Sequence, residues 1–341
     1  IGGTTGDKMG GVASVEDNKY GFNGSTTGKQ VVERLAKEGV TGEGLVIFVT
    51  GTTHGIGLET VRALATLKGP NVTLVLANRN VEASTAVGEE LKKNGCEGLT
   101  VHHLKLDLSD HSSVRACAAS FLELGLPLHR LVLNAGIFAA EYGETKEGYE
   151  RHFGINHLGH FLLTSLLLPK LEETGTADSL ARVVVVASHS HYPGVVDFND
   201  LPLKKETFGN VANQKAYAQS KLCNVLFANE LNRRLVADGK NVRAYSLHPA
   251  TMTGSNLGDG SMLVRATMRI ASVFTRSLEQ ASATTITCTF SPQLEGQGGG
   301  YYDKCSRVQP SEAASNEELA KKLWEFSEEL CAKHAPGQAA E

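Results

Sequence analysis

The chain has 341 residues, of which 41% are hydrophobic and 21% are charged, and its formal net charge is -4. This composition is typical of a globular protein, and the small negative charge excludes the basic field needed to bind nucleic acid. The six cysteines include no C-x-x-C pair. We therefore expect reduced thiols and an intracellular location, in the cytoplasm or in an organelle such as a plastid or mitochondrion. No apolar run approaches the roughly 18 residues of a membrane-spanning helix.

The first 43 residues are expected to form an N-terminal arm that carries a short helix. Residues 1–24 are Gly-rich, polar and aperiodic, which is typical of a tail that becomes ordered only on a partner. Residues 25–39 predict a helix in which Thr27 and Gln30 form a capping box and Gly39 marks the end. A protein partner held through residues 1–43 is therefore expected. Because the chain starts at Ile1, we also expect that it was processed or trimmed.

From Gly44 onward, apolar runs typical of strands alternate with helical segments. Residues 45–50 read LVIFVT, a run like those buried on both faces of a parallel sheet. Similar runs lie at 72–77, 99–107, 130–136, 182–188 and 242–249, and helical patterns lie at 58–69, 109–125 and, as a helix that ends at Pro169, 161–169. This alternation predicts an α/β fold: a doubly wound parallel sheet of the Rossmann type, in a single core domain over 44–310. A C-terminal helix and tail follow over 311–341.

The first predicted strand leads directly into TGTTHGIG, residues 50–57, and then into a helix. This order lets backbone N–H groups and the helix N-terminus hold a pyrophosphate. The spacing is G-x-x-x-G-x-G rather than the commoner G-x-G-x-x-G, and a mere turn is the alternative. Cofactor contacts are expected from six residues of this turn: Gly51, Thr53, His54, Gly55, Ile56 and Gly57.

The second predicted strand ends in LANRN, residues 76–80, which bears on the choice of cofactor. NAD-binding folds usually carry an acidic residue there for the ribose 2′-hydroxyl. This chain has Asn78 and Arg79 instead. A guanidinium can pair with a 2′-phosphate, and His54 can add a second donor. We therefore expect NADP(H), against the alternative of a merely solvent-exposed Arg79.

In AYAQSKLCN, residues 216–224, a phenol and an ammonium stand four residues apart. On a helix, Tyr217 and Lys221 would share one face, one turn apart. A fixed cation beside a phenol lowers the pKa of the phenol from about 10 and makes it a usable proton donor or acceptor. On these residues alone, a packing tyrosine and a solvated lysine are the simpler interpretation.

Six motifs in this order resemble the short-chain dehydrogenase/reductase family. They are TGxxxGIG, Asp107-Leu108, Asn134-Ala135-Gly136, Asn156, Ser188 and Tyr217-x-x-x-Lys221. The resemblance covers about residues 44–310 and is strongest toward retinol-dehydrogenase-like members, including dehydrogenase domains joined to WW modules. Shared stretches include INHLGHF (155–161) and SKLCNVLFANEL (220–231). Because Trp324 is the single tryptophan, WW modules themselves are expected to be absent.

The resemblance implies a role for each residue of these motifs. Tyr217 would be the general acid in carbonyl reduction or the base in alcohol oxidation, and Lys221 would lower its pKa and bind the nicotinamide ribose. Ser188 would hold the substrate oxygen, and Asn156 would anchor a water that links Lys221 to solvent. Further cofactor contacts are implied at Asn78, Arg79, Asp107, Leu108, Asn134, Ala135, Gly136, Tyr217, Lys221, Pro249 and Thr251.

Two long insertions are expected to recognise the substrate. Residues 189–216 would add a wall to the pocket, and residues 252–276 would form a lid. Met252, Met262 and Met268 lie in this lid, which suits a bulky apolar substrate. Arg265 and Arg269 within it suggest a peripheral membrane contact.

Four histidines near the motif residues are interpreted as packing or polar-surface groups: His157, His160, His189 and His191. No metal site is expected, because nothing else in the sequence converges on them.

The leading hypothesis is an NADP(H)-dependent oxidoreductase that reduces lipophilic aldehydes or ketones, or oxidises the alcohols, by hydride transfer. The alternative is a dehydrogenase-fold, nucleotide-binding accessory subunit of a larger assembly, which the arm over residues 1–43 favours.

Overall fold

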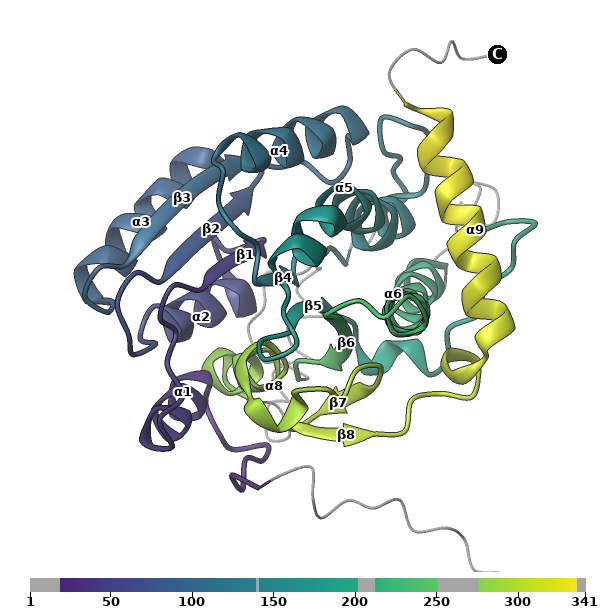
Figure 1. Cartoon of the computed structure of the whole chain (residues 1–341). Coiled ribbons are helices and arrows are strands. Elements are labelled where there is room, and N and C mark those ends of the chain that lie inside the picture. The colour runs from purple at the N-terminus through teal and green to yellow at the C-terminus, as the bar shows by residue number, and fades with distance from the viewer. Residues whose placement is uncertain (1–18, 139–140, 202–211, 251–275, 336–341) are drawn as a thin grey trace, which may run out of the picture.

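The computed structural model describes residues 19–138, 141–201, 212–250 and 276–335, and these form an α/β fold around one eight-stranded sheet (Figure 1). The strand order is β3-β2-β1-β4-β5-β6-β7-β8. The strands are β1 (Val46–Thr50), β2 (Thr73–Asn78), β3 (Thr100–Lys105), β4 (Arg130–Leu133), β5 (Ala181–Val186), β6 (Val242–His248), β7 (Tyr301–Asp303) and β8 (Ser306–Val308). All pairings are parallel except that of β7 with β8. The predicted doubly wound parallel sheet is therefore confirmed.

Helices cover both faces of this sheet because successive strand residues point to opposite sides. Ile47 and Val49 of β1 belong to one buried cluster, and Val46 and Phe48 belong to the other. The first cluster packs under α1 (Gly28–Lys37), α2 (Gly55–Leu64), α3 (Val81–Asn94) and α8 (Leu278–Phe290). The second packs under α4 (His111–Glu123), α5 (Gly159–Thr174), α6 (Ala212–Ala237) and α9 (Glu317–Lys333). Shorter helices are η1 (His152–Leu158), η2 (His189–His191), η5 (Pro292–Leu294) and η6 (Ala313–Ser315).

The strand order reverses between β1 and β4. The chain moves outward from β1 to β2 and β3 and then returns to β4 on the other side of β1. In open α/β sheets, ligands bind beyond the carboxyl ends of the strands at such a reversal. The glycine turn after β1 and the Asn134-Ala135-Gly136 segment after β4 both lie at this point.

The N-terminal helix α1 is part of the core. The predicted capping box is confirmed, since Thr27 and Gln30 bond each other's backbone N–H groups. Val31 and Leu35 are fully buried, and Phe22 ahead of the helix is 4% exposed. An arm that ends at residue 43 is therefore not what the structure shows for residues 19–43, because apolar burial carries this segment onto α2 and α8. Residues 1–18 lie outside the described residues.

Two other elements differ from the sequence-based expectation. Helix α5 runs to Thr174, so Pro169 does not end it; Leu167 and Leu171, on either side of the proline, are both buried and carry the helix onward. The β7–β8 hairpin was not predicted, since strands of three residues are too short to show a period. Among the described residues, no helix is both long and apolar enough to cross a membrane.

Helix α9, predicted from the sequence, is fastened to the core by Trp324. The indole is 8% exposed and lies 5.0 Å from the ring of Phe161 and 5.9 Å from the ring of Phe227. The guanidinium of Arg234 lies 4.6 Å from the indole centroid. The last helix is thus held to α5 and α6 through one aromatic side chain.

We expect Trp324→Ala to lower the free energy of unfolding by about 3–5 kcal/mol, because the large buried side chain leaves a cavity. Urea denaturation followed by far-ultraviolet circular dichroism measures the loss. Glu325→Ala, at the exposed neighbouring position on the same helix, is the control and should change stability by less than about 0.5 kcal/mol. Equal stability of the two variants would contradict the docking of α9.

Candidate active site

The glycine turn after β1 is locked against the loop that follows β4. Gly51 has a φ of +71°, and a Cβ there would lie 2.8 Å from the Cα of Ala135. A Cβ on Gly57 would lie 2.0 Å from the carbonyl oxygen of Gly51. The Asn134 side-chain amide donates to the carbonyl oxygens of Thr50 and Gly51, at 3.0 and 2.9 Å. Only glycine fits at positions 51 and 57. The glycine turn and the loop after β4 therefore lie directly against each other.

The N-terminus of α2 opens beside this contact. Gly55 has a φ of +62°, and a Cβ there would meet none of the described atoms within 4 Å. His54 caps the helix without a side-chain hydrogen bond to it; its Nδ1 instead lies 3.1 Å from Thr53 Oγ1. The N–H groups of the first turn are free of side-chain caps, and the space at Gly55 admits a phosphate. Ile56, partly exposed, completes a turn that fits a pyrophosphate.

Asn78, an expected cofactor contact, bonds within the protein. Its Oδ1 accepts from the Thr52 N–H at 2.7 Å, and its Nδ2 donates to Thr52 Oγ1 at 2.8 Å and to Ser84 Oγ at 2.9 Å. The residue is 4% exposed. Its amide therefore holds the glycine turn to the end of β2.

Arg79, the next residue, is exposed and makes no ion pair with any other described residue. Because β1 and β2 run parallel with Thr50 opposite Ala77, Arg79 and the glycine turn lie at the same edge of the sheet. A guanidinium at this place fits a 2′-phosphate on a nucleotide held by the turn. No acidic residue follows β2 before α3 begins at Val81.

The segment after β3 forms a compact turn. The Oδ1 of Asp107 accepts from Ser109, from the N–H at 2.9 Å and from Oγ at 2.6 Å. Leu108 is buried, and a Cβ on Gly159 would lie 2.6 Å from its carbonyl oxygen. Asp107 thus uses Oδ1 to hold the turn.

The segment after β6 is described only as far as residue 250. Pro249 and Ala250 are buried there. Thr251 and the expected lid lie outside the described residues, apart from Arg276 at the end of the lid. Of the expected pocket wall over 189–216, residues 202–211 also lie outside the described residues.

Helix α6 places Tyr217 and Lys221 one turn apart beside the end of β5. Lys221 is 4% exposed, and its Nζ donates to the carbonyl oxygen of Val186 at 3.0 Å and lies 5.7 Å from the Tyr217 ring centroid. The Tyr217 hydroxyl is hydrogen-bonded to the Ser188 side chain. Ser188 itself is held by the N–H of Ser190, which donates to its Oγ at 3.1 Å. The structure brings the phenol, the hydroxyl and the ammonium together.

The electrostatics of this group differ from the expectation. Burial raises the pKa of Tyr217 above its ordinary value, and the hydrogen bond with Ser188 opposes that rise. Burial also lowers the pKa of Lys221 to about 8. The expectation that Lys221 lowers the pKa of Tyr217 is therefore not met in the chain by itself. The reason is that burial is the largest influence on the pKa of Tyr217, while the ammonium of Lys221 bonds to the Val186 carbonyl oxygen.

Asn156 joins the loop after β4 to α6. Its Oδ1 accepts from the Ile137 N–H at 2.8 Å, and its Nδ2 donates to the Ile137 carbonyl at 3.1 Å and to Ser220 Oγ at 3.0 Å. A Cβ on Gly136 would lie 3.2 Å from Asn156 Oδ1 and 3.4 Å from Lys221 Nζ. Asn156 lies in η1, a stretch of π-helix, and such bulges are frequent at functional sites.

Three residues around Tyr217 were missed by the sequence analysis. The ring of Phe138 lies edge-on to Tyr217 at 5.0 Å, and that of His152 lies at 6.1 Å. The Nδ1 of His152 is 2.6 Å from Oε1 of Glu150, with both side chains buried. An acid and an imidazole two residues apart, just before INHLGHF, are the signal that could have pointed to this pair.

Three of the four histidines weighed in the sequence have packing roles. His160 Nδ1 donates to the Asn156 carbonyl oxygen at 3.2 Å, and its Nε2 lies 3.0 Å from Thr50 Oγ1; burial lowers its pKa to about 3. His157 Nε2 lies 2.8 Å from Ser327 Oγ. His191 Nδ1 donates to the Ser188 carbonyl oxygen at 2.8 Å. The fourth, His189, lies instead beside His248 and Asp303.

Comparison with known proteins agrees with this fold. The family model described as short chain dehydrogenase matches residues 45–198. Human WW domain-containing oxidoreductase is 38% identical, over 96% of this chain and 78% of that protein. Human retinol dehydrogenase 11 is 40% identical, over 84% of this chain and 86% of that protein.

A solved structure shares both fold and sequence with the chain. An uncharacterised protein from Mycobacterium paratuberculosis superposes with a TM-score of 0.68 at 31% identity, over 86% of this chain and 95% of that one. With such identities to its relatives over most of its length, the chain belongs to the short-chain dehydrogenase/reductase family of oxidoreductases.

Proposed function

We propose that the chain is an NADP(H)-dependent oxidoreductase that reduces lipophilic aldehydes or ketones, or oxidises the corresponding alcohols. The observation that carries the proposal is the meeting of Tyr217, Ser188 and Lys221, with Asn156 hydrogen-bonded to Ser220 on the same helix as Tyr217 and Lys221. A proton donor, a hydroxyl that can hold an oxygen, and a cation are the groups that carbonyl reduction needs.

In the proposed mechanism, the protein donates the proton and binds the substrate oxygen. A nicotinamide cofactor, when bound, supplies or accepts the hydride. Because the pKa of Tyr217 is raised, the phenol stays protonated at neutral pH and can donate its proton to the oxygen of the substrate. The Ser188 hydroxyl would hold that oxygen. With a pKa of about 8, Lys221 remains mostly protonated at pH 7, and its ammonium lies 5.7 Å from the Tyr217 ring centroid.

Two observations support a lipophilic substrate. The names of the related retinol dehydrogenases refer to a long apolar alcohol. In this chain, the ring of Phe138 packs edge-on against Tyr217 at 5.0 Å. Apolar side chains beside a small polar group are typical of sites for apolar ligands.

NADPH is expected to bind more tightly than NADH because Arg79 can pair with the 2′-phosphate. Arg79→Ala should weaken NADPH binding about tenfold and change NADH binding little, since one charge-assisted contact is lost. Calorimetric titration of both cofactors measures the two affinities. Arg34→Ala, which removes a half-exposed arginine of α1, is the matched control. Equal losses for NADPH and NADH in the Arg79 variant would contradict the assignment.

Tyr217→Phe removes the proton donor with little change in shape. We expect NADPH oxidation with retinal and long-chain aldehydes to fall about 10²- to 10⁴-fold, while NADPH binding survives. Lys221→Ala should lower both turnover and NADPH binding. Tyr20→Phe, in the segment before α1, is the control and should keep full turnover. A Tyr217→Phe variant as fast as the parent would exclude the acid–base role, and a parent that binds NADPH without turning over any apolar carbonyl would support the accessory-subunit alternative.

A further inference from the structure

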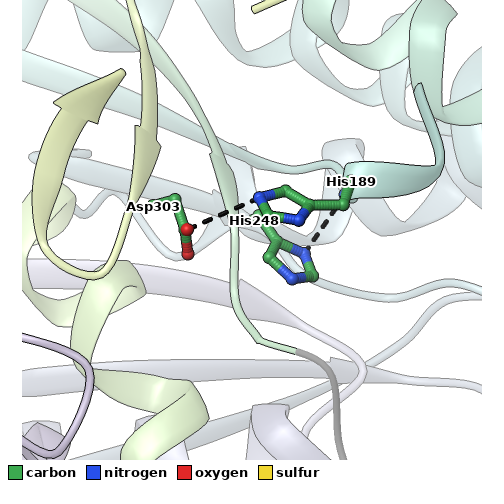
Figure 2. A group of neighbouring side chains, drawn as sticks. All are labelled: His189, His248 and Asp303. Carbon is green, nitrogen blue, oxygen red and sulfur yellow. Dashed lines mark hydrogen bonds and ion pairs between the residues drawn. The ribbon is translucent and has the colours of Figure 1, made fainter. Parts of the chain in front are cut away.

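A second group of side chains meets at the carboxyl ends of three neighbouring strands (Figure 2). His248 ends β6 and Asp303 ends β7, and the two residues are partners in the parallel register of these strands. His189 begins η2, directly after Ser188 and the end of β5. The sheet itself therefore brings two imidazoles and a carboxylate together, although they lie far apart in the sequence.

The distances within this group are close to those of a metal site. One ligand atom from each of the three side chains lies within 4.8 Å of the other two. His189 Nε2 is 3.4 Å from Asp303 Oδ2. Zinc ligands at about 2.0–2.2 Å from the ion are separated by about 3.4 Å from one another. The two imidazoles are stacked, with ring centroids 4.0 Å apart and an interplanar angle of 22°. Binding therefore requires the His189 ring to turn as well as to move inward by on the order of 1 Å, and this side chain is 48% exposed.

Asp303 supplies a second indication that a cation belongs here. The residue is 7% exposed, and its Oδ1 is buried without a hydrogen bond among the described residues. The cation nearest to that oxygen in the described chain is Arg276, whose Nη1 lies 4.0 Å away. At that distance the guanidinium makes no hydrogen bond. A buried carboxylate oxygen left so weakly paired is costly unless a cation satisfies it.

Binding at His248 would also act on the backbone beside Ser188. Nδ1 of His248 accepts from the His189 N–H at 3.2 Å (Figure 2). The hydrogen of the neutral imidazole therefore sits on Nε2. A metal bound through either nitrogen exchanges this hydrogen bond for a bond to the ion. The backbone of His189, and of Ser188 next to it, would then shift when the metal binds.

We propose that His189, His248 and Asp303 bind one transition-metal ion of the zinc type. Two imidazole nitrogens and one carboxylate favour Zn²⁺ or Co²⁺ over Mg²⁺ and Ca²⁺, which require mainly oxygen ligands. Three protein ligands leave a fourth position for water. None of the three ligands is among the residues that we assign to hydride transfer, so the site goes beyond the proposed function.

Metal binding by the full chain tests the site without any enzyme assay. After treatment with a chelator, the protein is titrated with Co²⁺ and then with Zn²⁺. We expect one Co²⁺ per chain with the intense visible absorption of tetrahedral cobalt, displaced by Zn²⁺. Calorimetry should give a single Zn²⁺ site and no heat with Mg²⁺. His189→Ala and Asp303→Asn should each weaken Zn²⁺ binding at least tenfold, since even residues behind the ligands contribute that much.

Two controls make the result specific. His102→Ala removes a partly exposed imidazole on β3, at the other edge of the sheet, and should keep the parent affinity. Cys96 is the one cysteine that is not buried, and Cys96→Ser should likewise bind Zn²⁺ as the parent does. The circular dichroism spectra and melting curves of all variants show that they fold.

The proposal is overturned by any of three results. One is a cobalt spectrum of the octahedral aqueous ion. Another is a folded His189→Ala variant that binds Zn²⁺ as tightly as the parent. The third is a near-ultraviolet thiolate-to-cobalt band that disappears in Cys96→Ser, which would place the ion at the cysteine.

Discussion

The hydroxyl of Thr50, at the last position of β1, holds the site together. It accepts hydrogen bonds from the backbone N–H groups of Asn134 and Ala135, both at 3.0 Å, and it lies 3.0 Å from Nε2 of His160. His160 in turn donates to the carbonyl oxygen of Asn156. One buried side chain thus links the glycine turn, the loop after β4 and the π-helix. Because Thr50 and His160 are buried, and Asn134 and Ala135 are partly buried, loss of this hydroxyl would leave several polar groups unsatisfied.

The two edges of the sheet are used differently. At the amino edge, Arg130 and Arg182 lie opposite each other in the register of β4 and β5. Their guanidinium groups donate to carbonyl oxygens at the end of α8, those of Thr289 and Ser291, at 2.8 and 2.9 Å, and Arg182 pairs with Glu295. Helix C-termini favour cations, so both buried guanidinium groups find their partners within the fold. At the carboxyl edge, by contrast, the N–H groups at the start of α2, the guanidinium of Arg79 and Oδ1 of Asp303 remain available to bind a ligand.

Lys221 shows how burial alters a motif that reads simply in sequence. In water an ammonium beside a phenol would favour the phenolate, but here both groups are desolvated. Burial raises the pKa of Tyr217 and lowers that of Lys221, and the ammonium is satisfied by the carbonyl oxygen of Val186. The chain by itself therefore presents a protonated phenol. This state is the one required of a proton donor in carbonyl reduction.

The sequence alone determined the strands β1 to β6 and the order of the motifs. The apolar runs at 45–50 and 72–77 predicted β1 and β2 because strands buried on both faces are continuously apolar, and this is a local property. The Thr27–Gln30 capping box was predicted for the same reason. The motif order also indicated that Tyr217, Lys221, Ser188 and Asn156 belong together.

Only the tertiary structure decided how those residues are engaged. The two pKa shifts depend on burial, which no spacing reveals, and Asn78 could be recognised as a clasp on Thr52 only once its partners were in place. Phe22 lies in a Gly-rich stretch with the pattern of a tail, yet its side chain is buried in the cluster that α1, α2, α3 and α8 cover. His248 and Asp303 became neighbours through the register of β6 and β7, with His189 beside them. Pairing between distant strands depends on the whole sheet, so local periodicity cannot predict which side chains meet at its edge.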